Sequence, residues 1–231
     1  MRIAKFISNA GYCSRREAER LINKKKVYIN KKLCEAPNVN VMENDKITIN
    51  GNIIKLNKKI RLWKMYKPTN VICTNNDPKK RKTIFEFLPK NMPRAISIGR
   101  LDFMSEGLIL LTNNGDFARK LELPSSNIIR IYRVYVATVV KNNDIKKINY
   151  GVIINGILYN KIEVKIEKMN QNKTSLKFKL REGKNREIRN ICRYFKWPII
   201  KLIRLQYGSI KLNKEKPGQI KEVDPIPYTF V

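Results

Sequence analysis

The stretch from residue 98 to residue 116 constrains the fold more than any other part of the chain. Gly99 permits a sharp bend of the backbone, and the Asn-Asn-Gly run at 113–115 provides the next turn. The apolar run between these turns is short, which predicts a buried strand. Asp102 precedes that run. The sequence therefore predicts a carboxylate at the mouth of a rigid element, where an anchored reactive group belongs.

The charge of the chain is strongly unbalanced, with 49 Lys and Arg against 19 Asp and Glu and a formal net charge of +30. Such an excess of positive charge gives information about binding partners and association rates rather than about the fold. A polyanion is the expected partner, and nucleic acid is the commonest one. A membrane surface is the alternative, but the sequence contains no basic amphipathic anchor or lipidation signal. AT-rich coding also accounts for part of the Lys content.

The chain contains no histidine, which excludes Ser-His and Cys-His catalytic pairs and His-bearing metal sites. Its four cysteines form no CxxC motif, so we expect reduced, mostly buried thiols rather than a disulfide framework or a zinc site. No apolar stretch is long enough to cross a membrane. A helical pattern starts at once, without a signal or transit peptide before it. We therefore expect a cytoplasmic protein without a metal.

The first 55 residues are expected to form a small domain of two short helices and a hairpin. Apolar residues at helical spacing up to Ala10 are followed by Gly11, which is typical of a helix end. Ser14 to Glu17 has the pattern of a capping box that opens a second helix. Strand signals follow at 27–29 and from Leu33, and the unit is expected to end near 49–51. Its outward basic residues are Arg15, Arg16, Arg20, Lys24, Lys25 and Lys26.

This segment resembles the S4 domain, an RNA-binding module, on the strength of residues 11–19 and of Val-Tyr-Ile-Asn at 27–30. The resemblance implies that the Ser-Arg-Arg helix start and the basic hairpin face RNA phosphates. A helix N-terminus with flanking arginines is in any case suited to anions. Phosphate contacts position a protein on RNA but carry little sequence information. The alternative interpretation is a basic face that is merely solvated.

A linker near residues 56–60 separates this unit from a second domain, expected over 61–231. Strand-like runs dominate that part of the chain, with short helical segments between them. They lie at 62–66, 129–140, 162–166 and 176–180. This pattern predicts an α+β fold, with a mixed and largely antiparallel sheet flanked by helices.

The motif around Asp102 resembles the catalytic motif of ribosomal RNA pseudouridine synthases, in the family of small-subunit synthase A and large-subunit synthase B. The match covers residues 99–102, 105–107 and the Leu-rich run to Gly115. It implies that Asp102 attacks a uridine that has been flipped out of its stack, and that no cofactor is needed. The alternative is that Asp102 only forms a turn, as aspartate often does.

A second motif, at residues 129–136, places Arg130, Tyr132 and Val134 on one face of a strand. By resemblance, Tyr132 is the active-site tyrosine of the family, which stacks on the flipped uracil and takes the C5 proton. A phenol has both a π face and a polar tip. The family usually carries Lys and Glu where this chain has Arg130 and Ile131. An ordinary sheet tyrosine is the alternative.

A third motif, at residues 180–189, leads into a helix with an apolar face and a separate basic stripe. The apolar face comprises Ile188, Ile191, Cys192 and Phe195, and the stripe comprises Arg186, Arg189 and Arg193. By resemblance, Arg189 pairs with the catalytic aspartate, where a guanidinium would keep the carboxylate ionised and oriented. Lys184 and Arg186 are then expected near the RNA backbone.

Tyr66-Lys67-Pro68 resembles the Lys-Pro-x-Gly motif of the family, with Asn70 in place of the glycine. Asn tolerates a positive φ better than most residues. We expect RNA contacts from Lys67, from Arg100 and from the loop at 77–82. The resemblance extends over residues 1–223.

These features together predict a monomeric pseudouridine synthase that acts on ribosomal RNA. Asn-Arg-Glu-Ile-Arg at 185–189 is more similar to the enzymes of the large-subunit synthase B type than to those of the small-subunit type, which usually have a His-Gln pair there. This favours 23S over 16S rRNA. The alternatives are a 16S enzyme and a non-catalytic RNA-binding ribosome-assembly factor. Intact Asp102, Tyr132 and Arg189 argue against the assembly factor.

Overall fold

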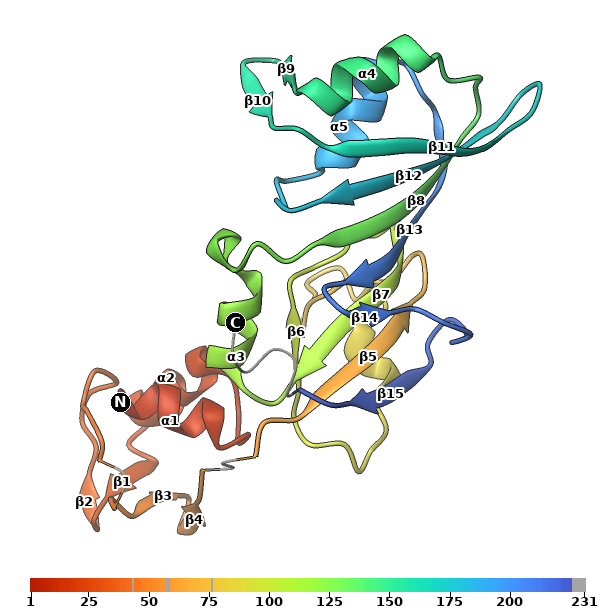
Figure 1. Ribbon diagram of the computed structural model, residues 1–231. Helices are drawn as coiled ribbons and strands as arrows, with labels where there is room; N and C mark the ends of the chain where they lie inside the picture. Colours follow the sequence, from red (N-terminus) through yellow and green to blue (C-terminus); the bar gives the residue numbers. More distant parts are fainter. Residues whose placement is uncertain (43, 57–58, 76, 226–231) are drawn as a thin grey trace.

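The computed structural model describes residues 1–42, 44–56, 59–75 and 77–225 of the chain. It has a small N-terminal part and a larger part built on one long twisted sheet (Figure 1). No helix in these ranges is both long and apolar enough to cross a membrane. The four cysteines are free thiols.

The N-terminal part packs two helices on a four-stranded sheet with the order β2-β1-β3-β4. The elements are α1 (Ile3–Asn9), α2 (Arg15–Asn23), β1 (Val27–Ile29), β2 (Lys32–Leu33), β3 (Ile47–Ile49) and β4 (Asn52–Ile54). Ser14 caps α2 by accepting a hydrogen bond from the Glu17 N–H at 3.2 Å. The Glu17 carboxylate accepts from Arg20 instead of completing the expected capping box.

The apparent end at residues 49–51 is a turn within the N-terminal part, and β4 after it lies inside the 55 residues expected for that domain. Asn50 and Gly51 both have positive φ and form the tight turn between β3 and β4. Such a turn matches the twist of a hairpin and continues a sheet rather than ending it. Residues 57 and 58 of the expected linker lie outside the described residues.

The larger part contains a nine-stranded sheet among the described residues, with the main order β11-β12-β8-β13-β7-β5-β15. The strands on this path are β5 (Leu62–Lys67), β7 (Glu106–Thr112), β8 (Arg130–Val136), β11 (Glu163–Met169), β12 (Thr174–Leu180), β13 (Ile199–Tyr207) and β15 (Ile220–Val223). Two short strands flank it, β6 (Ile96–Ile98) against β7 and β14 (Ile210–Lys211) against β13. The mixed, largely antiparallel sheet confirms the expected α+β class, although β8 is shorter than the run at 129–140.

Helices cover the two halves of this sheet, each over its own hydrophobic core. One half carries α4 (Asn142–Tyr150), α5 (Glu187–Tyr194) and a small hairpin, β9 (Val152–Ile154) with β10 (Ile157–Tyr159). The other half carries α3 (Gly115–Glu122), and the short 3-10 turns are η1 (Ile84–Phe87) and η2 (Pro124–Ser126). The apolar face of α5 is buried as expected, through Ile188, Ile191 and Cys192.

The two halves of the sheet meet where β13 and β7 run parallel, through the pairs Ile203–Glu106 and Arg204–Gly107. Gly107 has φ +102°, and a Cβ atom there would lie 2.4 Å from the carbonyl oxygen of Arg204. Only glycine permits so close an approach. The loop at residues 99–105 connects β6 to β7 beside this seam. Strand β7 is buried at all seven positions, so the predicted buried strand after Asp102 is confirmed.

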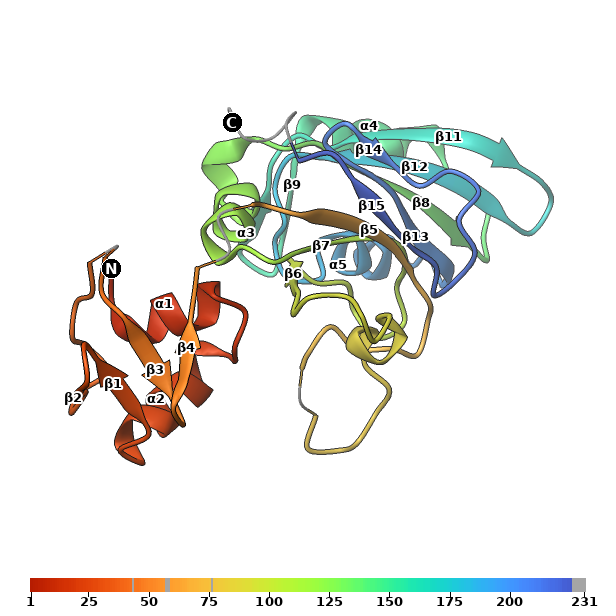
Figure 2. The same ribbon diagram turned by 90° about the horizontal axis from the view of Figure 1, so that it is seen from below.

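The N-terminal part lies beside α3 of the larger part in both views (Figures 1 and 2). Lys5 Nζ of α1 is 2.7 Å from the Asp116 carboxylate at the start of α3. This ion pair joins the two parts of the molecule.

Candidate active site

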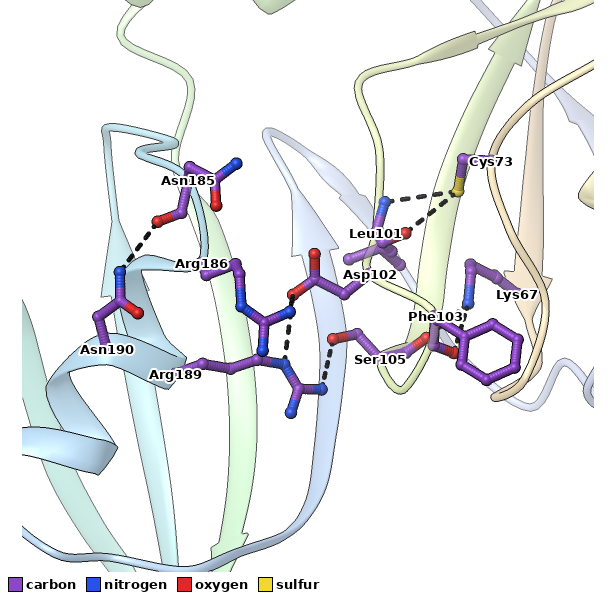
Figure 3. A network of polar contacts seen from close by, with 10 residues as sticks. All are labelled: Lys67, Cys73, Leu101, Asp102, Phe103, Ser105, Asn185, Arg186, Arg189 and Asn190. Atoms are coloured by element: carbon purple, nitrogen blue, oxygen red, sulfur yellow. Dashed lines mark hydrogen bonds and ion pairs between the residues drawn. The ribbon is translucent and has the colours of Figure 1, made fainter. Parts of the chain in front are cut away.

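Asp102 lies in the loop between β6 and β7 and faces the N-terminal end of α5 across the seam (Figure 3). Arg189 Nε lies 3.2 Å from its Oδ2, and Arg186 Nη1 lies 3.4 Å from the same oxygen. Its side chain is 30% exposed. Both of these contacts are to Oδ2, so the two guanidinium groups anchor the carboxylate through that oxygen.

Arg189 is itself held from a second direction. Its Nη2 donates a hydrogen bond of 2.8 Å to the Ser105 hydroxyl, which lies on the same loop as Asp102. Burial lowers the pKa of Arg189, while the neighbouring Asp102 carboxylate opposes that change. An arginine stays protonated in either case. The guanidinium thus fixes the orientation of the carboxylate relative to α5.

Lys67 supports the Asp102 loop from below, and the expected RNA contact of this residue is wrong. Its side chain is fully buried, and its Nζ donates to the carbonyl oxygens of Ser105 at 2.7 Å and Pro68 at 2.9 Å. A longer hydrogen bond of 3.5 Å reaches Phe103. Burial lowers the pKa of Lys67 to about 8. An ammonium enclosed by carbonyl groups cannot also contact an RNA phosphate.

Two further contacts pin the same loop. Asn70 takes the left-handed conformation, with φ +58°, and its N–H donates to the Phe103 carbonyl at 2.9 Å. Asparagine thus occupies the glycine position with the backbone that glycine would adopt. Cys73 Sγ accepts from the Leu101 N–H at 3.4 Å and donates to the Leu101 carbonyl at 3.5 Å. The backbone on both sides of Asp102 is therefore fixed.

A cavity of about 1200 Å³ opens in front of Asp102. Tyr132 of β8 lines it and is half-buried, and Arg204 of β13 lies directly across the strand pair from Tyr132. Among the described residues, Tyr132 has no hydrogen bond to Asp102. The tyrosine thus forms part of the cavity wall, and its ring offers a face against which a flat substrate ring can lie.

The remaining residues expected to bind RNA divide into two groups. Six are exposed and form no ion pair among the described residues, namely Arg15, Arg16, Lys24, Lys25, Lys26 and Arg100. The others are engaged with the protein itself. Arg20 pairs with Glu17, Arg186 pairs with Asp102, and Lys184 Nζ lies 2.7 Å from both the Glu182 carboxylate and the Leu158 carbonyl. RNA binding by either group stays a prediction.

Three polar residues at this cavity had no role in the sequence analysis. Ser105 belongs to the quoted motif, but its hydroxyl acts only through Arg189, which is distant in sequence. Arg204 is 2% exposed and donates through Nε to the Leu108 carbonyl at 2.5 Å. Burial raises the pKa of Glu187 to about 7. Arg204 could have been identified from the alternation of strand residues, because it lies two positions after Leu202 and therefore on the same face of the strand.

The arrangement is suited to nucleophilic catalysis on a planar substrate. A carboxylate is a competent nucleophile when its charge and direction are held by neighbouring groups. Here cations lie on one side of Asp102, an aromatic ring lines the cavity, and the loop beneath is rigid. The site contains no histidine, so acid–base steps fall to other side chains.

Comparisons with known proteins find matches among RNA pseudouridine synthases. A family profile described as RNA pseudouridylate synthase matches residues 61–194, and an S4 domain profile matches residues 1–47. An uncharacterized RNA pseudouridine synthase of Rickettsia typhi is 48% identical over 223 residues, which is 96% of this chain and 91% of the relative. The ribosomal large subunit pseudouridine synthase B of Bacillus subtilis is 33% identical over 97% of this chain and 92% of that protein.

The fold also matches a solved structure. A crystal structure of a pseudouridylate synthase superposes with a TM-score of 0.69 at 21% identity, over 99% of this chain and 98% of that one. The profiles and relatives together span both parts of the molecule, including the Asp102 loop and α5. The chain therefore belongs to the RNA pseudouridylate synthase family, whose enzymes isomerise uridine in RNA, and it carries an S4 domain at its N-terminal end.

Proposed function

We propose that this enzyme converts a uridine of 23S ribosomal RNA to pseudouridine, with Asp102 as the nucleophile. The observation that carries the proposal is the Asp102 carboxylate, anchored through one oxygen by Arg189 and Arg186 at the mouth of a large cavity. The named large-subunit relative and the Asn-Arg-Glu-Ile-Arg run at 185–189 support 23S over 16S rRNA.

In the proposed reaction, a carboxylate oxygen of Asp102 displaces uracil from C1′ of the target ribose, so the N1–C1′ bond breaks. The uracil turns within the cavity, and its C5 then displaces the carboxylate from C1′. The proton lost from C5 ends on N1, so the atoms balance and nothing is oxidised or reduced. The uridine must be flipped out of its stack before the carboxylate can reach it.

Tyr132 is proposed to stack on the flipped uracil and to accept the C5 proton. Its place on the cavity wall supports the stacking role. Arg189 is proposed to keep Asp102 ionised and aimed while the substrate carbon approaches. A misplacement of the carboxylate by 1 Å would cost about two orders of magnitude in rate.

The exposed cations of the N-terminal part are proposed to hold the RNA through its phosphates. The enzyme is further proposed to work as a monomer, without a cofactor, in the cytoplasm where ribosomal RNA is assembled.

Pseudouridine mapping tests the function. Unmodified 23S and 16S transcripts are incubated separately with wild type and with Asp102→Asn, then probed by carbodiimide labelling and primer extension. We expect a stop in 23S that wild type produces and Asp102→Asn abolishes, while the variant keeps RNA affinity within a few-fold. A stop in 16S alone would overturn the 23S assignment, and equal activity of the variant would overturn the role of Asp102.

A further inference from the structure

A second hollow lies at the junction of the S4 domain and the catalytic domain. Its volume is about 280 Å³, far smaller than the active-site cavity. Both domains contribute to its wall. Ser8, Asn9 and Arg15 come from the S4 domain, and the catalytic domain adds Arg94, Arg119 and Glu122 among others. We call this hollow the interdomain notch.

The notch exists because the two domains are held together beside it. The Lys5–Asp116 ion pair joins α1 to the start of α3. The Asn9 side chain lies 3.6 Å from the position where a Cβ of Gly115 would stand. Figure 2 shows α1 and α2 facing β6 and α3 across this junction. Arg15 is thereby brought to the same hollow as Arg94 and Arg119, which are distant from it in sequence.

The charges in the notch are unbalanced. Three arginines line it, Arg15, Arg94 and Arg119, and none of them forms an ion pair with a carboxylate among the described residues. The single acidic residue of the lining is Glu122, whose Oε1 already accepts a hydrogen bond of 2.6 Å from the Gly99 N–H. Arg94 is half-buried, and this burial lowers the pKa of its guanidinium.

Arginines gathered at one hollow favour a phosphate, which guanidinium groups bind through charge-assisted hydrogen bonds. Ser8, Asn9 and Ser97 add further donors to the lining. We propose that the interdomain notch binds a backbone phosphate of the substrate RNA, on the stretch that leads from the S4 domain to the target uridine. This inference rests on the proposed function, because it takes RNA as the substrate.

The notch is connected to the catalytic site through Glu122. This residue lines both hollows, and its carboxylate holds Gly99, where the loop that carries Asp102 begins. A phosphate in the notch therefore lies next to the element that positions the nucleophile. The notch would set how far the flipped uridine lies from the S4 contact, which is a constraint on the geometry of the RNA rather than on its sequence.

The test measures the salt dependence of binding. Full-length wild type, Arg94→Gln, Arg119→Gln and the double variant are titrated into the unmodified 23S transcript at a series of salt concentrations. Each lost phosphate contact should reduce the slope of log K against log salt by about 0.7–0.9. Because the notch is proposed to hold one phosphate, we expect a slope reduced by up to one such step in each single variant, by about one step in the double variant, and a wild-type slope in Arg94→Lys, which keeps the charge.

The matched control is Lys146→Gln with Lys168→Gln, which removes the same charge from exposed positions on α4 and β11. A double variant of the notch that matches this control in slope would overturn the proposal. Pseudouridine formation by wild type is measured on the same transcript. An active wild type with unchanged slopes removes the notch alone, whereas changed slopes with an inactive wild type remove the proposed function and keep the notch as an RNA site.

Discussion

The cations around Asp102 and those on the S4 domain are the same residue types in opposite situations. Near Asp102, Lys67 and Arg204 are buried and Arg189 is mostly so, and each donates to a named group of the protein. On the S4 domain, residues such as Arg16 and Lys24 are exposed and form no ion pair among the described residues. The first set holds one loop in place, and the second is free to attract a distant polyanion.

This difference implies different responses to salt. A buried charge that is hydrogen-bonded to carbonyl groups is weakly screened, whereas exposed charges lose most of their reach within a Debye length of about 8 Å at physiological ionic strength. Raising the salt concentration should therefore weaken RNA binding long before it disturbs the catalytic loop. Variants of the buried cations near Asp102 should therefore affect the catalytic loop, and variants of the exposed cations of the S4 domain should affect RNA binding.

The largest effect is expected for Arg189→Gln. This change removes the group that holds Asp102 Oδ2 and the Ser105 hydroxyl together, so the nucleophile loses its direction. We expect a loss of about 10²-fold or more in the single-turnover rate, with RNA affinity within a few-fold. Arg193→Gln, on the exposed side of the same helix, is the control and should react at the wild-type rate. Equal rates for both variants would contradict the positioning role.

Lys67→Met should mainly lower stability. The substitution keeps most of the side-chain volume but leaves the carbonyl groups of Ser105 and Pro68 without their buried donor. We expect the free energy of unfolding to fall by about 3 kcal/mol in chemical denaturation. Hydrogen exchange of residues 99–105 should also accelerate. Lys79→Met, at an exposed position, is the control, and an equally small change in both variants would show that the lysine does not hold the loop.

Glu187→Gln tests the one buried carboxyl group at the cationic cavity, and its effect depends on pH. The pKa of Glu187 is raised from 4.5 to about 7, so the folded protein keeps a proton that the unfolded chain releases. The stability that this group contributes is therefore full below pH 4.5 and falls as the pH rises through 7. We expect the variant to be more stable than wild type by about 3 kcal/mol at pH 8 and about equal near pH 4.5. The same difference at both pH values would contradict the burial of a neutral carboxyl.

The smallest effect on the fold is expected for the exposed cations of the S4 domain. Arg16→Gln with Lys24→Gln should leave the free energy of unfolding within about 0.5 kcal/mol of wild type, because neither side chain holds other elements. RNA affinity should fall several-fold, with a salt slope reduced by about 0.7–0.9 for each lost contact. An unchanged slope would remove these residues from the RNA-binding surface.

The parts of the molecule that could be predicted are those with a local pattern. The buried strand after Asp102 follows from a short apolar run between two turns, and the apolar face of α5 follows from helical spacing. The left-handed Asn70 follows from its place in a motif that normally carries glycine. In each case a few neighbouring residues contain the information.

The parts that could not be predicted depend on partners that are far apart in the chain. Lys67 resembles any other basic residue of the sequence until the fold encloses it with the carbonyl of Ser105, which is 38 positions away. The interdomain notch depends on how α1 docks beside α3, for which neither segment carries a periodic signal. The parallel pairing of β13 with β7 involves only two residue pairs and likewise leaves no sequence pattern.

That short parallel pairing gives Gly107 a consequence for the whole enzyme. Asp102 is fastened to one half of the sheet, and Arg189 to the other half through the packing of α5. A methyl group at position 107 would lie 2.4 Å from the Arg204 carbonyl oxygen and would force the two halves of the sheet apart. The distance between Asp102 and Arg189 thus depends on a residue that lies outside the active site. One additional carbon atom at position 107 would be enough to misalign the two side chains.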